Sequence, residues 1–140
     1  MSKIFEDEFM DLQSEFVSLA LELIGNKADE IYIYISIEEK SRMFNAFFKI
    51  DNEIKTTNLI GADDSLIFQF LKLGTGDILR IEELCKEYGM KIPTEMKMVY
   101  HVQTGTYNVD LKYESICGAK TGINAVEVFR QWIQEVKESV

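Results

Sequence analysis

The first part of the chain has the hydrophobic spacing of a helix that buries one face. Large apolar side chains recur at alternating steps of four and three residues: Phe5, Phe9, Leu12, Phe16, Leu19 and Leu23. This spacing follows one side of an α-helix. Gly25 and Asn26 come directly afterwards, and both are residues that commonly end helices. The pattern therefore predicts an amphipathic helix over residues 4–24.

The period then changes to two residues, which is the repeat of a β-strand. Over residues 29–37, isoleucines at every second position point to one face, whereas Tyr32 and Tyr34 point to the other. A second strand is predicted over residues 42–50. A third, over residues 53–60, has a polar centre, which favours a position at the edge of the sheet.

Helical spacing returns in the second half of the chain. A helix is predicted to begin near Leu66, to break at Gly74-Thr75-Gly76, and to restart with Asp77 as its cap before ending at Gly89.

A hairpin and a helix complete the prediction. Strands over residues 96–102 and 106–113 are joined by a short turn containing Gly105. A last helix is expected over residues 122–138. The apolar residues that it should bury are Val126, Phe129, Trp132, Ile133 and Val136.

The resulting order of elements, α-β-β-β-α(α)-β-β-α, is typical of an α+β fold. Because the strand connections have hairpin length, we expect a mostly antiparallel sheet of about five strands, with helices packed on one face. The 140 residues are enough for one hydrophobic core, so a single domain over residues 1–140 is predicted.

Acidic side chains dominate the charge, and the formal net charge is -9. Residues 1–30 hold eight acids and two lysines, and residues 63–90 hold six acids and three basic residues. A surface that binds nucleic acid needs clustered Lys and Arg, so direct nucleic-acid binding is not expected. A basic protein is the more natural partner, because opposite potentials accelerate encounter.

Four of these acids form a stripe beside the apolar face of the first predicted helix. Glu8, Asp11, Glu15 and Glu22 follow one another at steps of three, four and seven residues. Like charges at this helical spacing repel one another by roughly a few tenths of a kcal/mol. Two interpretations stand: a solvated face that keeps the protein soluble, or a surface whose repulsion a cationic partner relieves.

Two further pairs are candidate partner-binding residues. Tyr32 and Tyr34 lie on the sheet face opposite the isoleucines, and exposed tyrosines are enriched in protein interfaces. The alternative for this pair is that another helix covers that face. Asp63 and Asp64 precede the next helical pattern, where they are N-cap candidates and exposed acids for the same cationic partner.

Residue types that carry catalysis or bind metals are scarce. His101 is the one histidine and falls within a predicted strand, so we expect a half-exposed strand residue. Gly74-Thr75-Gly76 lacks the Gly-Lys-Ser/Thr of a phosphate-binding loop, and the acidic pairs lack the spacing of a calcium loop. We therefore expect no enzymatic activity, no cofactor and no metal.

The cysteines and the apolar stretches bear on the cellular compartment. Cys85 falls on the apolar face of a predicted helix and is expected to be a reduced core thiol, far in sequence from Cys117. No apolar run reaches the roughly 18 residues that a membrane span needs. The first residues run into Glu6, Asp7 and Glu8 instead of an apolar signal segment. These features predict a cytoplasmic protein with no membrane partner.

The second predicted hairpin resembles a known family. Residues 105–114 of this hairpin have the sequence Gly-Thr-Tyr-Asn-Val-Asp-Leu-Lys-Tyr-Glu. This segment is similar to a strand of the YezG-like immunity proteins that has the pattern glycine-aromatic-x-Val-x-hydrophobic-x-Tyr-acid. The hairpin over residues 29–50 after an acidic helix, and the helix end at 84–89, match the same layout. The resemblance implies an antitoxin that neutralises a nuclease toxin of a bacterial competition system.

A second class of function accounts for the same composition. Small acidic α+β proteins also serve as secretion chaperones or as small-ligand-binding adaptors in the cytoplasm. Such a chaperone is usually a stable dimer that holds a partly unfolded segment. An immunity protein would instead form a one-to-one complex with a folded, basic toxin domain.

Overall fold

The computed structural model describes residues 4–38, 41–116 and 122–140. The elements run in this order: α1 (Phe5–Ile24), the short 3-10 helix η1 (Gly25–Lys27), β1 (Glu30–Ile37), β2 (Arg42–Ile50), β3 (Glu53–Thr56), the 3-10 helix η2 (Thr57–Leu59), α2 (Asp64–Glu87), β4 (Glu95–His101), β5 (Thr106–Lys112) and α3 (Ala125–Ser139). The predicted α+β class and the order of strands and helices are confirmed. Cys117 and part of the predicted 38–41 connection lie outside the described residues.

The described strands form one five-stranded antiparallel sheet in the order β3-β2-β1-β4-β5. β1 is the central strand, and residues 31–37 are all buried. Its isoleucines face one side and its tyrosines the other, so burial on both faces requires an interior position. β3 lies at an edge, as predicted, but it is shorter than predicted because the chain turns into η2 at Thr57.

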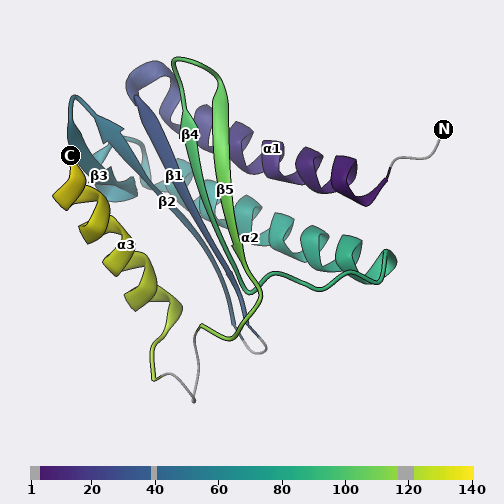
Figure 1. Ribbon diagram of the computed structural model, residues 1–140. Helices are drawn as coiled ribbons and strands as arrows, with labels where there is room; N and C mark the ends of the chain where they lie inside the picture. The colour runs from purple at the N-terminus through teal and green to yellow at the C-terminus, as the bar shows by residue number, and fades with distance from the viewer. Residues whose placement is uncertain (1–3, 39–40, 117–121) are drawn as a thin grey trace.

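Helices cover both faces of this sheet (Figure 1). α1 and α2 pack on the face that carries the isoleucines, and α3 packs on the opposite face. The prediction that helices occupy one face only is therefore wrong. Its physical reason is that Tyr32, Tyr34 and Phe47 make the second face apolar as well, and an apolar sheet face has to be buried against another element.

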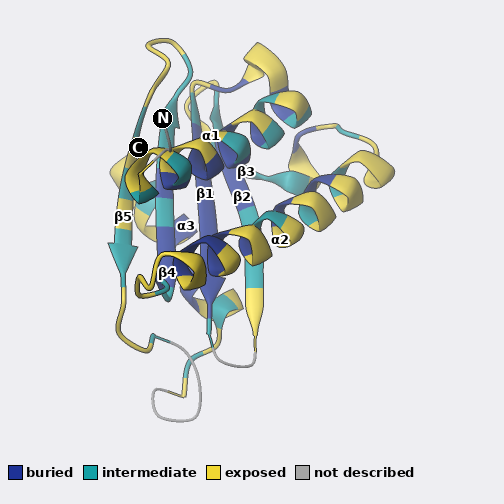
Figure 2. Ribbon diagram, turned by 90° about the vertical axis from the view of Figure 1, so that its right-hand side faces the viewer, coloured by how far each residue is buried: buried dark blue, intermediate teal, exposed yellow. Residues whose placement is uncertain are grey.

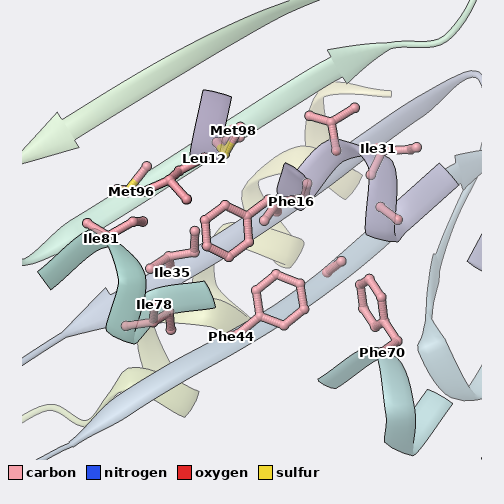
Figure 3. Close-up of a cluster of buried hydrophobic side chains, with 14 of the residues drawn as sticks. Leu12, Phe16, Ile31, Ile35, Phe44, Phe70, Ile78, Ile81, Met96 and Met98 are labelled. Atoms are coloured by element: carbon pink, nitrogen blue, oxygen red, sulfur yellow. The ribbon is translucent and has the colours of Figure 1, made fainter. Parts of the chain in front are cut away.

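The larger core lies between the sheet and the α1–α2 layer (Figure 3). Phe16 from α1, Phe44 from β2 and Phe70 from α2 meet at its centre. The ring centroids are 5.6 Å apart for Phe16 and Phe44 and 5.0 Å apart for Phe44 and Phe70. These contacts join three elements that are distant in the sequence, and so they set how both helices lie on the sheet.

α2 runs without interruption through the Gly74-Thr75-Gly76 segment, where a break was predicted. Gly74 is buried against β2, and a Cβ added there would lie 2.1 Å from a ring carbon of Phe44. Because real Cβ contacts are never that short, glycine here permits a close approach of the helix to the sheet. Asp77 consequently lies inside the helix instead of capping a second one.

The smaller core joins α3 to the outer face of β1 and β2. Phe47 and Tyr32 stack with centroids 4.6 Å apart, and Trp132 meets Phe47 edge-on at 5.0 Å. Phe129 and Ile133 are buried as predicted, and Val136 is half-buried. Val126, which was expected to be buried, is 44% exposed, because Val128 takes the inward position of the first helical turn.

Tyr34→Phe is expected to lower the free energy of unfolding by about 1.5 kcal/mol, since a buried hydrogen bond to a charged group is lost. The Tyr34 hydroxyl donates to Glu95 Oε1 at 2.9 Å, and Glu95 is 2% exposed. Urea unfolding followed by far-UV circular dichroism measures the change.

Tyr32→Phe is the matched control for that substitution. The Tyr32 hydroxyl donates to Glu30, whose side chain is 26% exposed, so water can replace the lost donor. If the two variants lose the same free energy of unfolding, the buried Tyr34–Glu95 hydrogen bond contributes no more than the part-buried Tyr32–Glu30 hydrogen bond.

Candidate functional site

The acidic stripe of α1 faces the neighbouring helix. α1 and α2 lie side by side over the sheet with their outer faces exposed (Figure 2). They are antiparallel, because Phe5 at the start of α1 contacts Tyr88 at the end of α2, with ring centroids 5.7 Å apart. The burial of Phe9, Leu12 and Phe16 against the core turns the neighbouring acidic positions toward α2.

Three of the four stripe residues line a shared groove between the two helices. This acidic groove has a volume of about 340 Å³, and the residues that line it are Glu8, Asp11, Leu12, Glu15, Arg80, Glu83, Leu84 and Glu87. Among these described residues, five are carboxylates and one is a guanidinium. The groove is therefore a concave surface with a strong excess of negative charge.

Arg80 joins the two helices across this groove. Its guanidinium contacts the carboxylate of Glu15 on α1 and lies 3.3 Å from Asp77 Oδ1 on its own helix. The hydrogen bond with Glu15 raises the pKa of Arg80, so the guanidinium stays charged. Burial and the negative charge of Glu15 raise the pKa of Asp77, and its contact with Arg80 opposes that rise. The one guanidinium among the residues that line the acidic groove thus already forms ion pairs with carboxylates of the protein itself.

A contact between the two helix ends lies beside the acidic groove, at Glu8. The Tyr88 hydroxyl donates to the carboxylate of Glu8. This hydrogen bond raises the pKa of Tyr88 to about 12, with a smaller effect of burial. The phenol therefore remains a neutral donor at ordinary pH, and it adds no negative charge to the groove.

Glu22, the fourth stripe residue, belongs to a different hollow on the same seam. This apolar groove has a volume of about 110 Å³, and the residues that line it are Leu19, Glu22, Leu23, Leu66, Gln69, Phe70 and Leu73. Leu66 and Leu73 are 51% and 46% exposed. The predicted stripe is therefore divided, with three acids in one groove and one beside exposed leucines.

Asp63 and Asp64 are exposed at the start of α2, within one turn of Leu66. The main-chain carbonyl of Asp63 accepts from the amide of Leu66 at 3.0 Å. Within the described residues, the Asp63 side chain makes no capping hydrogen bond, although it was a predicted N-cap. Both acids are thus exposed charges within one turn of Leu66, which lines the apolar groove.

Tyr32 and Tyr34 are not available to a partner in this structure. Their exposed fractions are 6% and 0%, and α3 covers both rings. The prediction that they contact a partner is contradicted, and the alternative that a helix covers this face is confirmed. An apolar sheet face attracts any helix with a complementary apolar side, whether from a partner or from the same chain.

The residues that α2 contributes were missed in the sequence. Glu83 and Glu87 are four apart and so share a helical face, but that spacing alone does not tell which helix lies beside them. Because a break was predicted at Gly74, Leu66 and Arg80 were assigned to two different helices, whereas in the structure they belong to one helix.

Cys85 and His101 line neither of the two grooves. Cys85 is buried, and burial, with the nearby charge of Glu82, raises the pKa of its thiol. His101 is half-buried at the end of β4, as predicted. In the described ranges, no set of three or more His, Cys, Asp or Glu side chains is placed to hold a metal ion.

None of the described helices is both long enough and apolar enough to span a bilayer.

In comparisons with known proteins, no family model matches this sequence, and a search of curated proteins found no significant match.

Proposed function

We propose that this chain is a cytoplasmic immunity protein that binds a basic toxin domain through the acidic groove and neutralises it without catalysing a reaction. The observation that carries the proposal is the convergence of five carboxylates from two helices on one groove lined by a single guanidinium. Because both helices are fixed by the core beneath them, these charges are held in place before a partner arrives. Fixed complementary charge favours fast and specific association.

A nuclease toxin is the partner class that fits this surface best. Such an enzyme needs clustered Lys and Arg to neutralise the phosphates of its substrate. A concave acidic surface can pair with those side chains and so compete with nucleic acid for the same site. The resemblance of residues 105–114 to the YezG-like immunity proteins supports the same class.

The first test is affinity capture of the tagged protein from lysate of its native cells, followed by mass spectrometry and a neutralisation assay. We expect a one-to-one complex with a basic domain whose nuclease activity is lost on binding. A stable dimer that captures many unrelated, partly unfolded proteins would contradict the proposal and favour the secretion-chaperone alternative.

Removal of groove charge is expected to slow association with that domain. The triple variant Asp11→Asn, Glu83→Gln and Glu87→Gln should lower the association rate constant about tenfold at low salt, because electrostatic steering is weakened. Stopped-flow or surface-based kinetics at several salt concentrations measure the rate, and the salt dependence should become shallower.

The control variant removes three exposed acids outside the groove: Glu114→Gln, Glu135→Gln and Glu138→Gln. It changes the net charge equally, so it separates local steering from overall charge. If both triple variants slow association to the same extent, the acidic groove is not the binding surface.

A further inference from the structure

The acidic and apolar grooves are two parts of one continuous seam between α1 and α2. On α1 the seam follows Glu8, Asp11, Glu15, Leu19 and Glu22, which are separated by steps of three and four residues. On α2, the residues from Leu66 to Glu87 that line the two grooves share one helical face in the same way. The Arg80–Glu15 ion pair marks the boundary between the two grooves.

The apolar part of this seam is incompletely covered by the chain itself. Leu66 and Leu73 keep about half of their surface exposed, although Phe70 between them is buried in the core. Large aliphatic side chains lose favourable free energy when they stay in contact with water. A groove lined by them gains stability when apolar side chains of another molecule enter it.

Negative charge lies within and beside the apolar groove. Glu22 lines it, and the acidic groove with its five carboxylates continues along the seam from Glu15. Asp63 and Asp64 are exposed within one turn of Leu66 at the start of α2. A purely apolar ligand would offer no positive charge to Glu22 or to the carboxylates of the acidic groove. Charge complementarity therefore requires an occupant that is both apolar and cationic.

We propose that the seam binds an amphipathic helix of the partner, with large apolar side chains at one end and Lys or Arg at the other. This inference rests on the proposed function, and it specifies how the basic partner is held. The centres of the two grooves are roughly ten to fourteen helical residues apart, which corresponds to about 15–20 Å. The apolar and basic ends of the docking helix should have the same separation, with the intervening residues passing over the Arg80–Glu15 pair.

The test uses three synthetic peptides of about 20 residues. In the first, leucines occupy one face of the first two turns and lysines the same face of the last two, with alanine between them. The second replaces the leucines with alanine, and the third keeps the composition of the first but interleaves leucine and lysine. Fluorescence anisotropy gives the dissociation constants, and amide chemical shifts locate the bound peptide.

We expect the first peptide to bind most tightly and to shift amides in both grooves. The double variant Leu66→Ser and Leu73→Ser should weaken this binding about tenfold, because two apolar contacts are lost. Leu79→Ser is the matched control on the same helix: Leu79 is 50% exposed but lines neither groove, and its substitution should change the affinity less than twofold. Circular dichroism verifies that all variants are folded.

The other outcomes separate the two proposals. If all three peptides bind equally and Leu66→Ser with Leu73→Ser has no effect, the inference is wrong, while the acidic groove still stands as a site for basic partners. If no peptide binds at low salt, the inference is wrong, and the proposed function is decided separately by the capture of a one-to-one complex with a basic domain. If sedimentation shows a dimer that the double variant dissociates, a second copy of the chain occupies the groove and the inference is overturned.

Discussion

Trp132→Ala is expected to lower the free energy of unfolding by about 3–5 kcal/mol, the cost typical of removing a buried tryptophan from a core. Trp132 is 8% exposed at the centre of the contact between α3 and the sheet. Its ring meets Phe47 at 5.0 Å and Tyr32 at 5.8 Å between centroids, both edge-on. Lys97 Nζ lies 5.5 Å from the Trp132 ring centroid, which adds a cation–π contact.

The loss of stability should be concentrated in α3. The buried residues of the smaller core that do not belong to the sheet all come from α3, so a cavity there weakens the attachment of residues 125–139 before it affects α1 and α2. Hydrogen exchange of α3 amides should therefore accelerate more than exchange in β1. Tyr32 and Tyr34 would become accessible in the opened state.

Urea unfolding measured by far-UV circular dichroism gives the change in stability, since the substitution removes the chain's one tryptophan and its fluorescence. Val126→Ala is the control on the same helix, because Val126 is 44% exposed and should cost little. A loss below about 1 kcal/mol for Trp132→Ala would mean that α3 contributes little to the stability of the sheet.

Gly74→Ala is expected to destabilise the protein by about 1–3 kcal/mol, even though alanine favours a helix over glycine by about 1 kcal/mol. The new methyl group would lie 2.1 to 2.5 Å from three ring carbons of Phe44. That ring is itself held between Phe16 and Phe70, so it cannot turn aside without disturbing both helices. Thermal and urea unfolding measure the change.

Gly76→Ala, two residues away, is expected to change the free energy of unfolding in the opposite direction. Among the described atoms, a Cβ added to Gly76 meets nothing within 4 Å, so only the gain in helix propensity remains. We expect a stabilisation of about 0.5–1 kcal/mol. A combined Gly74→Ala and Phe44→Leu variant should recover part of the loss, because a smaller side chain makes room for the methyl group. Equal effects of the two alanines would refute the close-approach role of Gly74.

The strands were predictable because their alternation is local and strong. Because isoleucine occupies every second position of β1, a slip of one residue in the pairing would turn all of the isoleucines to the other face, and such registers are excluded. What covers the other side was not predictable, since Tyr32 and Tyr34 suit a partner's surface and an intramolecular helix equally well. The choice depends on α3, more than 80 residues later in the chain.

The candidate site was predictable only on one helix. The stripe on α1 could be read from its spacing, but a groove needs two walls, and the second wall is α2. Gly74 shows why the continuity of α2 was missed. A glycine that permits close packing within a helix and a glycine that ends a helix cannot be distinguished in the sequence. Only the position of Phe44 distinguishes them.

The central place of β1 has a consequence for how the chain folds. β2 follows β1 directly and can close on it as a hairpin, whereas β4 reaches β1 only after α2, and Tyr34 and Glu95 are 61 positions apart in the sequence. Closing a longer loop costs more chain entropy, so this pairing comes late. A nascent chain synthesised only as far as α2 therefore carries β1 with one edge unpaired, and such edges recruit other chains. Synthesis of β4 pairs this open edge of β1 and places it in the middle of the sheet.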